Sequence, residues 1–203
     1  EQKSDDTPKN SESQNAQLAC SDEASGATAA DSAESTQLTV KRVRVSAHVQ
    51  NIGWMNPVGS GKVAGTTGRG LNLEALKISI DVDGASSQEQ VANALSVEAH
   101  VAGIGWQPAV GNGGTAGTTG RARAVEALRV RLSDGLSERY TVWYRVHSAE
   151  FGWLGWACDG AEAGSAGYGR AAQAVQVAVL PKGDPAPGDT SCPFKNRSDD
   201  PAS

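Results

Sequence analysis

Alternating apolar and polar positions mark long strands at several places in the chain. In the segment VRVSAHVQN, which begins at residue 43, every second side chain is apolar and the intervening ones are polar. A period of two is typical of a strand with one buried face. The apolar face holds Val43, Val45, Ala47 and Val49, and the polar face holds Arg44, Ser46, His48 and Gln50.

A second apolar alternation follows in LNLEALKISI, where Leu76, Ile78 and Ile80 share a face. LNLEALKI contains good helix formers, but its later counterpart VQVAVL is β-branched and is flanked by glycines, which favours strand. Equivalent apolar positions recur twice more along the chain, as Leu128, Val130 and Leu132 and as Val175, Val177 and Val179.

These strand segments belong to a block that occurs three times at fixed spacing. Each copy has a His, a Gly-Trp pair whose Trp follows that His by six residues, and an Ala-Gly pair ten residues later. Trp-to-Trp spacing is 52 and then 47 residues, so the slack lies in the connection of residues 81–90. Such repeats are units that bury their apolar faces against one another. The His-Trp pairs are His48 with Trp54, His100 with Trp106, and His147 with Trp153.

The pattern predicts one all-β domain with pseudo-threefold symmetry and three to four strands per copy. We expect the copies to span residues 39–90, 91–138 and 139–181. A β-prism, in which three sheets form the sides of a triangle, suits the long alternating strands and is preferred. A β-trefoil is the alternative, because it also accommodates repeats of this length.

Composition separates the two ends from this domain. Residues 1–38 contain eight acidic residues, two lysines and no aromatic residue, which predicts a disordered tail or linker. Residues 182–203 form a polar C-terminal extension, and residues 39–181 are nearly neutral. Without a basic stripe, nucleic acid is not an expected partner. No apolar run reaches the length of a membrane span, and we expect no membrane insertion.

The chain has three cysteines, so one intrachain disulfide would leave one thiol. We expect Cys158 to pair with Cys192, which would tie the C-terminal extension to the domain. Pairing of Cys20 with Cys192 is the alternative. The absence of CxxC or clustered His-Cys spacing argues against a metal site.

The motifs HVQNIGW, AGTTG and LEALKI resemble the clostridial hydrophobic W (ChW) repeat of secreted Gram-positive bacterial proteins. The resemblance covers residues 39–181. Copy three departs most, with Gln173 in place of the Glu of the other copies and Ser165-Ala166 in place of Thr-Thr, although its Trp156 fits a second Trp that many members carry. The resemblance implies an extracellular or cell-surface location and an accessory role in polysaccharide degradation, adhesion or surface interaction. It implies no known catalytic reaction.

The five tryptophans divide into two groups. Trp54, Trp106 and Trp153 recur in every copy, and we interpret them as core residues near the pseudo-threefold axis. Trp143 and Trp156 occur in copy three alone and are expected to be exposed platforms on which a sugar ring stacks. With these two tryptophans, the candidate ligand contacts are Gln50, Asn51 and Tyr168.

The repeated histidines and glutamates are interpreted as structural. A threefold axis can bring His48, His100 and His147 together at a metal, but strand alternation places them opposite the apolar face, so local hydrogen bonds are expected and no metal or cofactor is. Glu74 and Glu126 fall on the apolar face, which requires either a β-bulge or a buried pairing with His or with backbone N–H groups.

An enzyme is not expected. Acid–base catalysis needs two carboxylates in different environments, and repeat symmetry gives Glu74 and Glu126 similar ones. The sequence therefore predicts a non-catalytic extracellular module that binds a polysaccharide or surface glycan. The alternative is a protein-interaction or adhesion module without sugar affinity. The sequence does not indicate an oligomeric state.

Overall fold

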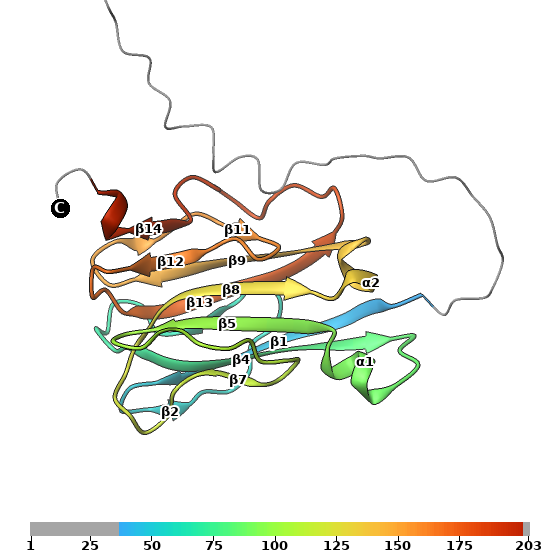
Figure 1. Cartoon of the computed structure of the whole chain (residues 1–203), viewed down its shortest axis with the longest axis horizontal. Coiled ribbons are helices and arrows are strands. Elements are labelled where there is room, and N and C mark those ends of the chain that lie inside the picture. Colours follow the sequence, from blue (N-terminus) through green and yellow to red (C-terminus); the bar gives the residue numbers. More distant parts are fainter. Residues whose placement is uncertain (1–36, 201–203) are drawn as a thin grey trace, which may run out of the picture.

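The computed structural model describes residues 37–200 and is all-β, as the sequence predicts (Figure 1). Residues 1–36, and with them Cys20 and nearly all of the expected acidic tail, lie outside this range. The helices are short: α1 (Gln88–Ala92), α2 (Asp134–Ser137) and the 3₁₀ turn η2 (Arg197–Asp199). None of the described helices is long and apolar enough to cross a membrane.

Each copy contributes four or five strands, two of them long. Copy one has β1 (Thr39–Val49), β2 (Gly53–Trp54), β3 (Val63–Gly65) and β4 (Leu73–Asp83). Copy two has β5 (Leu95–Val101), β6 (Gly105–Trp106), β7 (Thr115–Gly117) and β8 (Val125–Leu132). Copy three has β9 (Tyr140–Ser148), β10 (Gly152–Trp153), β11 (Ala157–Cys158), β12 (Ala163–Ala166) and β13 (Ala172–Pro181), and β14 (Phe194–Asn196) follows.

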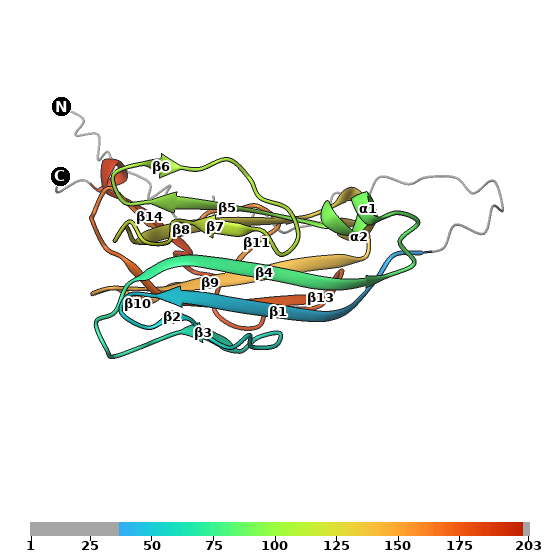
Figure 2. The same ribbon diagram turned by 90° about the horizontal axis from the view of Figure 1, so that it is seen from below.

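The two long strands of each copy form an antiparallel hairpin, and each hairpin lies in its own sheet. Figures 1 and 2 show the three hairpins running side by side in a common direction. Their apolar faces meet in one core that contains residues of all three copies. The first sheet has the order β2-β1-β4-β7, the second β14-β12-β8-β5-β6, and the third β10-β9-β13-β3 with β11 paired to β9. One sheet per copy is the arrangement that a β-prism requires.

A short strand from each copy crosses to the sheet of a neighbour. The strand β7 of copy two pairs with β4 of copy one, and β12 of copy three pairs with β8 of copy two. The strand β3 of copy one pairs with β13 of copy three, which closes the ring. Each of these crossings is called a seam below. Because every sheet borrows a strand, a single copy cannot complete its own sheet.

The Ala-Gly motif builds the seams. Gly117 lies on β7 with a φ of +101°, which L side chains rarely adopt, and a Cβ there would lie 2.5 Å from the carbonyl oxygen of Glu74 on the neighbouring copy. Only glycine permits this approach of the two backbones. The same close approach recurs at the other seams. A Cβ at Gly65 would lie 2.4 Å from the Gln173 carbonyl oxygen, and a Cβ at Gly164 would lie 2.4 Å from that of Glu126.

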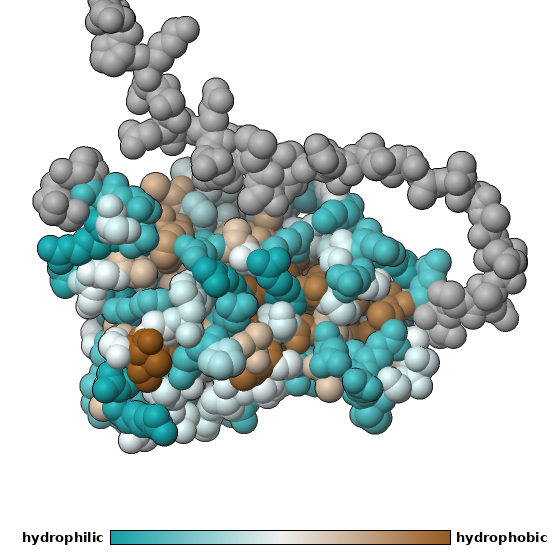
Figure 3. Space-filling model, viewed as in Figure 1, coloured by the Kyte–Doolittle hydropathy of each residue, from teal (hydrophilic) through white to brown (hydrophobic). Residues whose placement is uncertain are grey.

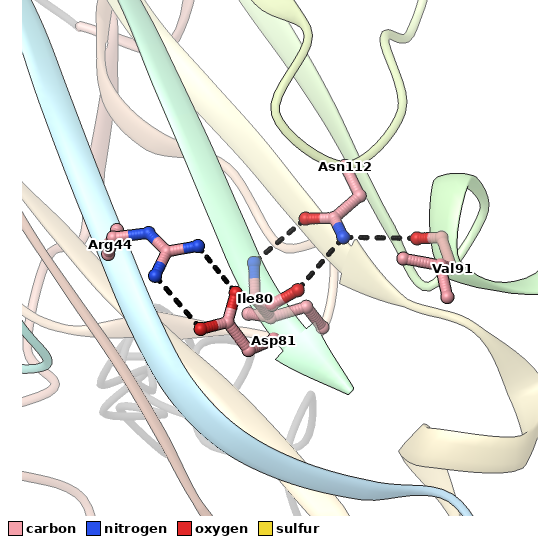
Figure 4. A network of polar contacts seen from close by, with 5 residues as sticks. All are labelled: Arg44, Ile80, Asp81, Val91 and Asn112. Atoms are coloured by element: carbon pink, nitrogen blue, oxygen red, sulfur yellow. Dashed lines mark hydrogen bonds and ion pairs between the residues drawn. The ribbon is translucent and has the colours of Figure 1, made fainter. Parts of the chain in front are cut away.

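A side-chain amide also ties copy two to copy one (Figure 4). The Asn112 side chain accepts a hydrogen bond from the Ile80 N–H at 2.8 Å and donates to the carbonyl oxygens of Ile80 and Val91 at 2.9 and 3.0 Å. Beside it, Arg44 on β1 forms a two-pronged ion pair with Asp81 on β4. These contacts fix the end of the first sheet against the start of copy two.

The C-terminal extension packs on copy three. The backbone N–H of Trp156 donates to the Asp189 carbonyl at 2.8 Å, the Gly164 N–H donates to the Pro193 carbonyl at 2.9 Å, and β14 pairs in parallel with β12. This segment helps to cover a second hydrophobic core, which consists of Trp143, Trp156, Cys158 and Ala178.

The cysteine predictions are wrong for Cys192. It is free and exposed, whereas Cys158 is buried and disulfide-bonded. The extension is therefore held to copy three by strand pairing, backbone hydrogen bonds and packing on the second core, and Cys192 takes no part in a disulfide.

Candidate functional site

The repeated tryptophans lie on the outer faces of the sheets, each against the His of its own copy. Residues His48 and Trp54 are direct cross-strand partners on β1 and β2, and their rings meet edge to face with centroids 5.3 Å apart. The spacing of six residues is therefore the length of a hairpin that returns the Trp beside the His. Copies two and three repeat the contact at 5.4 and 5.2 Å.

The prediction that these tryptophans form the core is wrong. Trp54 is 41% exposed, and Trp106 and Trp153 are half-buried. The reason is the pairing itself, because a residue opposite His48 shares its outward face. Two further apolar side chains at the same hairpin tips, Ile52 and Ile104, are 43% and 47% exposed. On the face drawn in Figure 3, separate hydrophobic patches interrupt a largely hydrophilic surface.

The prediction of exposed platforms at Trp143 and Trp156 is also wrong. These side chains are only 7% and 4% exposed. The C-terminal extension helps to cover them, because its Ala186 packs against the cluster that contains both side chains. The two groups of tryptophans are exposed the opposite way from the prediction, because the polar composition of the extension does not indicate that it packs on Trp143 and Trp156.

The remaining ligand candidates are engaged locally. The Gln50 side chain accepts a long hydrogen bond, 3.4 Å, from the Asn72 N–H, and Asn51 occupies a turn with a φ of 63°. Tyr168 donates to Asp200 at 3.2 Å, and its ring packs edge-on against Phe151 at 5.2 Å. Gln50 and Asn51 belong to a turn of copy one and Tyr168 belongs to copy three, so they do not form one cluster with the buried Trp143 and Trp156.

A cation lies over the indole of every copy, a feature that the sequence analysis missed. The Lys77 Nζ atom lies 4.8 Å from the Trp54 ring centroid, and the Arg129 guanidinium lies 4.0 Å from that of Trp106. In copy three the Arg145 guanidinium lies 4.6 Å from the centroid of Trp153 and 4.9 Å from that of Trp156. In copies one and two the sequence carries a sign of this cation, because a basic residue follows the repeated Glu by three positions. In copy three the cation comes from the other long strand, β9.

The cation sits in a row of three side chains across each outer face. The row crosses both long strands and reaches the borrowed seam strand. The three rows are Ser46-Lys77-Thr115, Glu98-Arg129-Glu162 and Arg145-Gln176-Val63.

Only the second row neutralises its cation with carboxylates. Arg129 is bound by Glu98 at 3.2 Å and by Glu162; burial opposes its charge, but the two carboxylates outweigh burial and raise the pKa of Arg129. Arg145 instead donates from Nε to the Gln176 amide oxygen at 2.7 Å. No carboxylate of residues 37–200 pairs with it, and burial lowers the pKa of Arg145.

The repeated glutamates lie beside the histidines of their own copies. In copy two the Glu126 carboxylate lies 3.1 Å from His100 Nδ1, off the line of an aligned hydrogen bond, and Glu74 pairs with His48 at the same distance. Both glutamates are the extra residue of a β-bulge. In copy one, Glu74 on β4 lies where the pairing shifts between His48 and Val49 of β1, and Glu126 on β8 has the equivalent place in copy two. Thus both alternatives predicted for them occur together. Burial raises the pKa of Glu126, although the neighbouring His100 lowers it.

Copy three replaces this pair with Gln173, and His147 Nδ1 has no hydrogen-bond partner among the described residues. The three histidines lie on three separate sheets. Within residues 37–200, no group of three or more His, Cys, Asp or Glu residues is arranged to hold a metal ion.

Taken as a class, this is an all-β domain of three repeats that exchange seam strands and that each display an indole backed by a cation. Family comparison agrees: the chain belongs to the ChW family, clostridial hydrophobic W, whose model matches residues 48–81, 100–134 and 147–181. ChW repeats are found in extracellular or surface proteins and are a repeat module, not a known enzyme family. Comparisons with curated proteins and with solved structures gave no match.

Proposed function

We propose that this domain is a non-catalytic extracellular module that binds a polysaccharide or cell-surface glycan through the indoles on its outer faces. The observation that carries the proposal is the exposure of Trp54, a large apolar side chain that leaves 41% of its surface open to solvent. A flat indole offers an apolar face to a sugar ring, and large apolar groups left at a surface often mark binding sites.

The Trp54 ring packs against two neighbours in the absence of a ligand. The ring is held edge-on by His48 at 5.3 Å and is covered in part by Lys77 at 4.8 Å. Holding a side chain in place in advance reduces the entropy lost on binding. The neighbouring row supplies the hydroxyls of Ser46 and Thr115 and the ammonium of Lys77, which are suitable partners for sugar hydroxyls.

The placement of the carboxylates supports a non-catalytic role. Glu74 and Glu126 lie in separate sheets, and each is paired with a histidine of its own copy. Glycoside hydrolysis needs two carboxyl groups flanking one bond, within about 10 Å of each other. The repeated glutamates instead support the strands that carry the indoles.

A protein-interaction or adhesion module is the second candidate. It is favoured by Ile52 and Ile104, which add exposed aliphatic surface beside the indoles and which a sugar uses less well than a protein does. In that case the tips of the hairpins would contact a surface protein.

Binding to a panel of soluble polysaccharides, by affinity electrophoresis followed by calorimetry, tests the proposal. Trp54→Ala should weaken binding about tenfold, because a lost stacking contact is worth about 1.4 kcal/mol at most. Lys41→Ala is the control: the Lys41 side chain is 62% exposed and lies at the end of β1 away from Trp54, so its loss should change little. Absence of binding to every polysaccharide, or full binding by a Trp54→Ala/Trp106→Ala variant, would overturn the proposal, and capture of a surface protein instead would favour the second candidate.

A further inference from the structure

We propose that the outer face of the third sheet binds a carboxylate of the glycan, that of a uronic acid, through the Arg145 guanidinium held between Trp153 and Trp156. The inference rests on the proposed function and names a ligand class for one of its three faces. It starts from a difference in charge between two otherwise equivalent rows of side chains.

In the second sheet the cation is already satisfied. Arg129 has carboxylates on both sides, Glu98 on one long strand and Glu162 on the seam strand. At the equivalent seam position the third sheet has Val63, and the other member of its row is the neutral Gln176. A buried charge is normally paired, and Arg145 departs from this rule within residues 37–200.

The geometry around Arg145 leaves a donor pair unused. Its Nε donates to Gln176, while Nη1 and Nη2 donate to none of the described residues. The guanidinium is planar and lies within 5 Å of two indole centroids, 4.6 Å from Trp153 and 4.9 Å from Trp156. Rings that hold the plane of a guanidinium prepare its N–H edge for bidentate contact with a carboxylate.

A second donor nearby also lacks an acceptor. Trp143 precedes Arg145 by two residues on β9 and shares its face. Its indole N–H is buried and meets no acceptor in the described part of the chain. Buried polar groups are normally hydrogen-bonded, so the donors of this region outnumber its acceptors, and the surroundings of Arg145 supply no negative partner.

A uronic acid fits both parts of this arrangement. Its carboxylate is planar, as the guanidinium fork requires, and its pyranose ring can lie against Trp153, which is only half-buried. Burial also disfavours the charge of the unliganded Arg145 and lowers its pKa. A bound carboxylate would oppose that effect, because an opposite charge nearby favours the charged form.

Calorimetry on the full chain with oligogalacturonate and its methyl-esterified form tests the inference, because the two ligands share a ring and differ in charge. The acid should bind at least about tenfold more tightly, and its affinity should fall with salt. Arg145→Gln should remove this preference, whereas Arg129→Gln, the matched control, should keep it. Melting temperature identifies any variant that fails to fold, and the salt dependence of the unaltered chain then decides the question.

The outcomes separate the inference from the proposed function. Equal affinity for the acid and the ester, or an unchanged preference in Arg145→Gln, overturns the carboxylate site while Trp54-dependent glycan binding stands. Absence of binding to any glycan removes both. A peptide with a free C-terminal carboxylate serves as a third ligand, and tighter Arg145-dependent binding of that peptide than of the sugar would overturn the assignment to a uronic acid.

Discussion

Copies two and three share a backbone and differ in what covers their outer faces. Both have a His-Trp pair with ring centroids 5.2–5.4 Å apart and a cation over the indole. In copy two, Glu98 and Glu162 neutralise the cation and the hairpin tip stays open, with Ile104 exposed. In copy three the cation lacks a carboxylate partner among residues 37–200, and the C-terminal extension covers part of the face.

The comparison teaches that the repeated motif and the variable positions have separate roles. Residues common to all copies make the hairpin, the bulge and the seam, which are geometric requirements of the sheets. Charge varies at the row positions, where side chains face outward and the fold tolerates substitution. Differences in ligand binding among the three faces should therefore depend on the side chains of the rows, which differ in charge, and not on the repeated motif, which the copies share.

The largest expected effect is loss of the second core, which copy two lacks. Trp156→Ala should lower the free energy of unfolding by about 3–5 kcal/mol, because it removes a buried indole and leaves a cavity under the extension. Trp106→Ala, at the outer face of copy two, should cost about 1 kcal/mol, from a lost cation–π contact and partial burial. Urea unfolding of both variants measures the contrast, and equal losses would contradict the burial difference.

A seam glycine should cost nearly as much when substituted. Gly164→Ala introduces a Cβ 2.4 Å from the Glu126 carbonyl oxygen at a φ of +116°, so about 2–4 kcal/mol of destabilisation is expected from strain and displacement of the strand. Gly169→Ala has a φ of +66° and open space, and should cost about 1 kcal/mol. A similar cost for both variants would show that the close approach across the seam is unimportant.

Removing the carboxylates of copy two should make its face resemble that of copy three. The double variant Glu98→Gln/Glu162→Gln frees Arg129 beside Trp106, at a cost of no more than about 1 kcal/mol for each partly exposed ion pair. Calorimetry should then detect additional binding of oligogalacturonate. The test fails if the double variant binds no more acidic ligand than the unaltered chain does.

The smallest effect concerns the buried glutamate, which copy three has already replaced with glutamine. Since burial raises the pKa of Glu126 in the folded protein, its protonated form favours folding. That contribution is present at low pH and is lost as the pH rises from about 4.3, the usual value for Glu, through the raised pKa. Glu126→Gln should remove this decline, which urea unfolding at several pH values measures, and parallel pH profiles would contradict the assignment.

The sequence predicted the elements that depend on local pattern. The alternation from Val43 to Val49 identified β1, and the misplaced Glu74 was expected to bulge or to pair, both of which occur. The seams were not predicted, because pairing of β7 with β4 joins different copies and leaves no period in the sequence. Exposure of Trp54 and burial of Trp156 were predicted the wrong way round, since each depends on a cross-strand partner or a covering segment distant in the chain.

The most direct test of the charge difference between the faces follows the arginine Nε–H and tryptophan Nε1–H resonances by NMR while oligogalacturonate is added to the unaltered chain. The account predicts that the signals of Arg145 and Trp153 shift at about tenfold lower ligand concentration than those of Arg129 and Trp106. Shifts of both arginines at the same ligand concentration, or a shift of Arg129 alone, would contradict it.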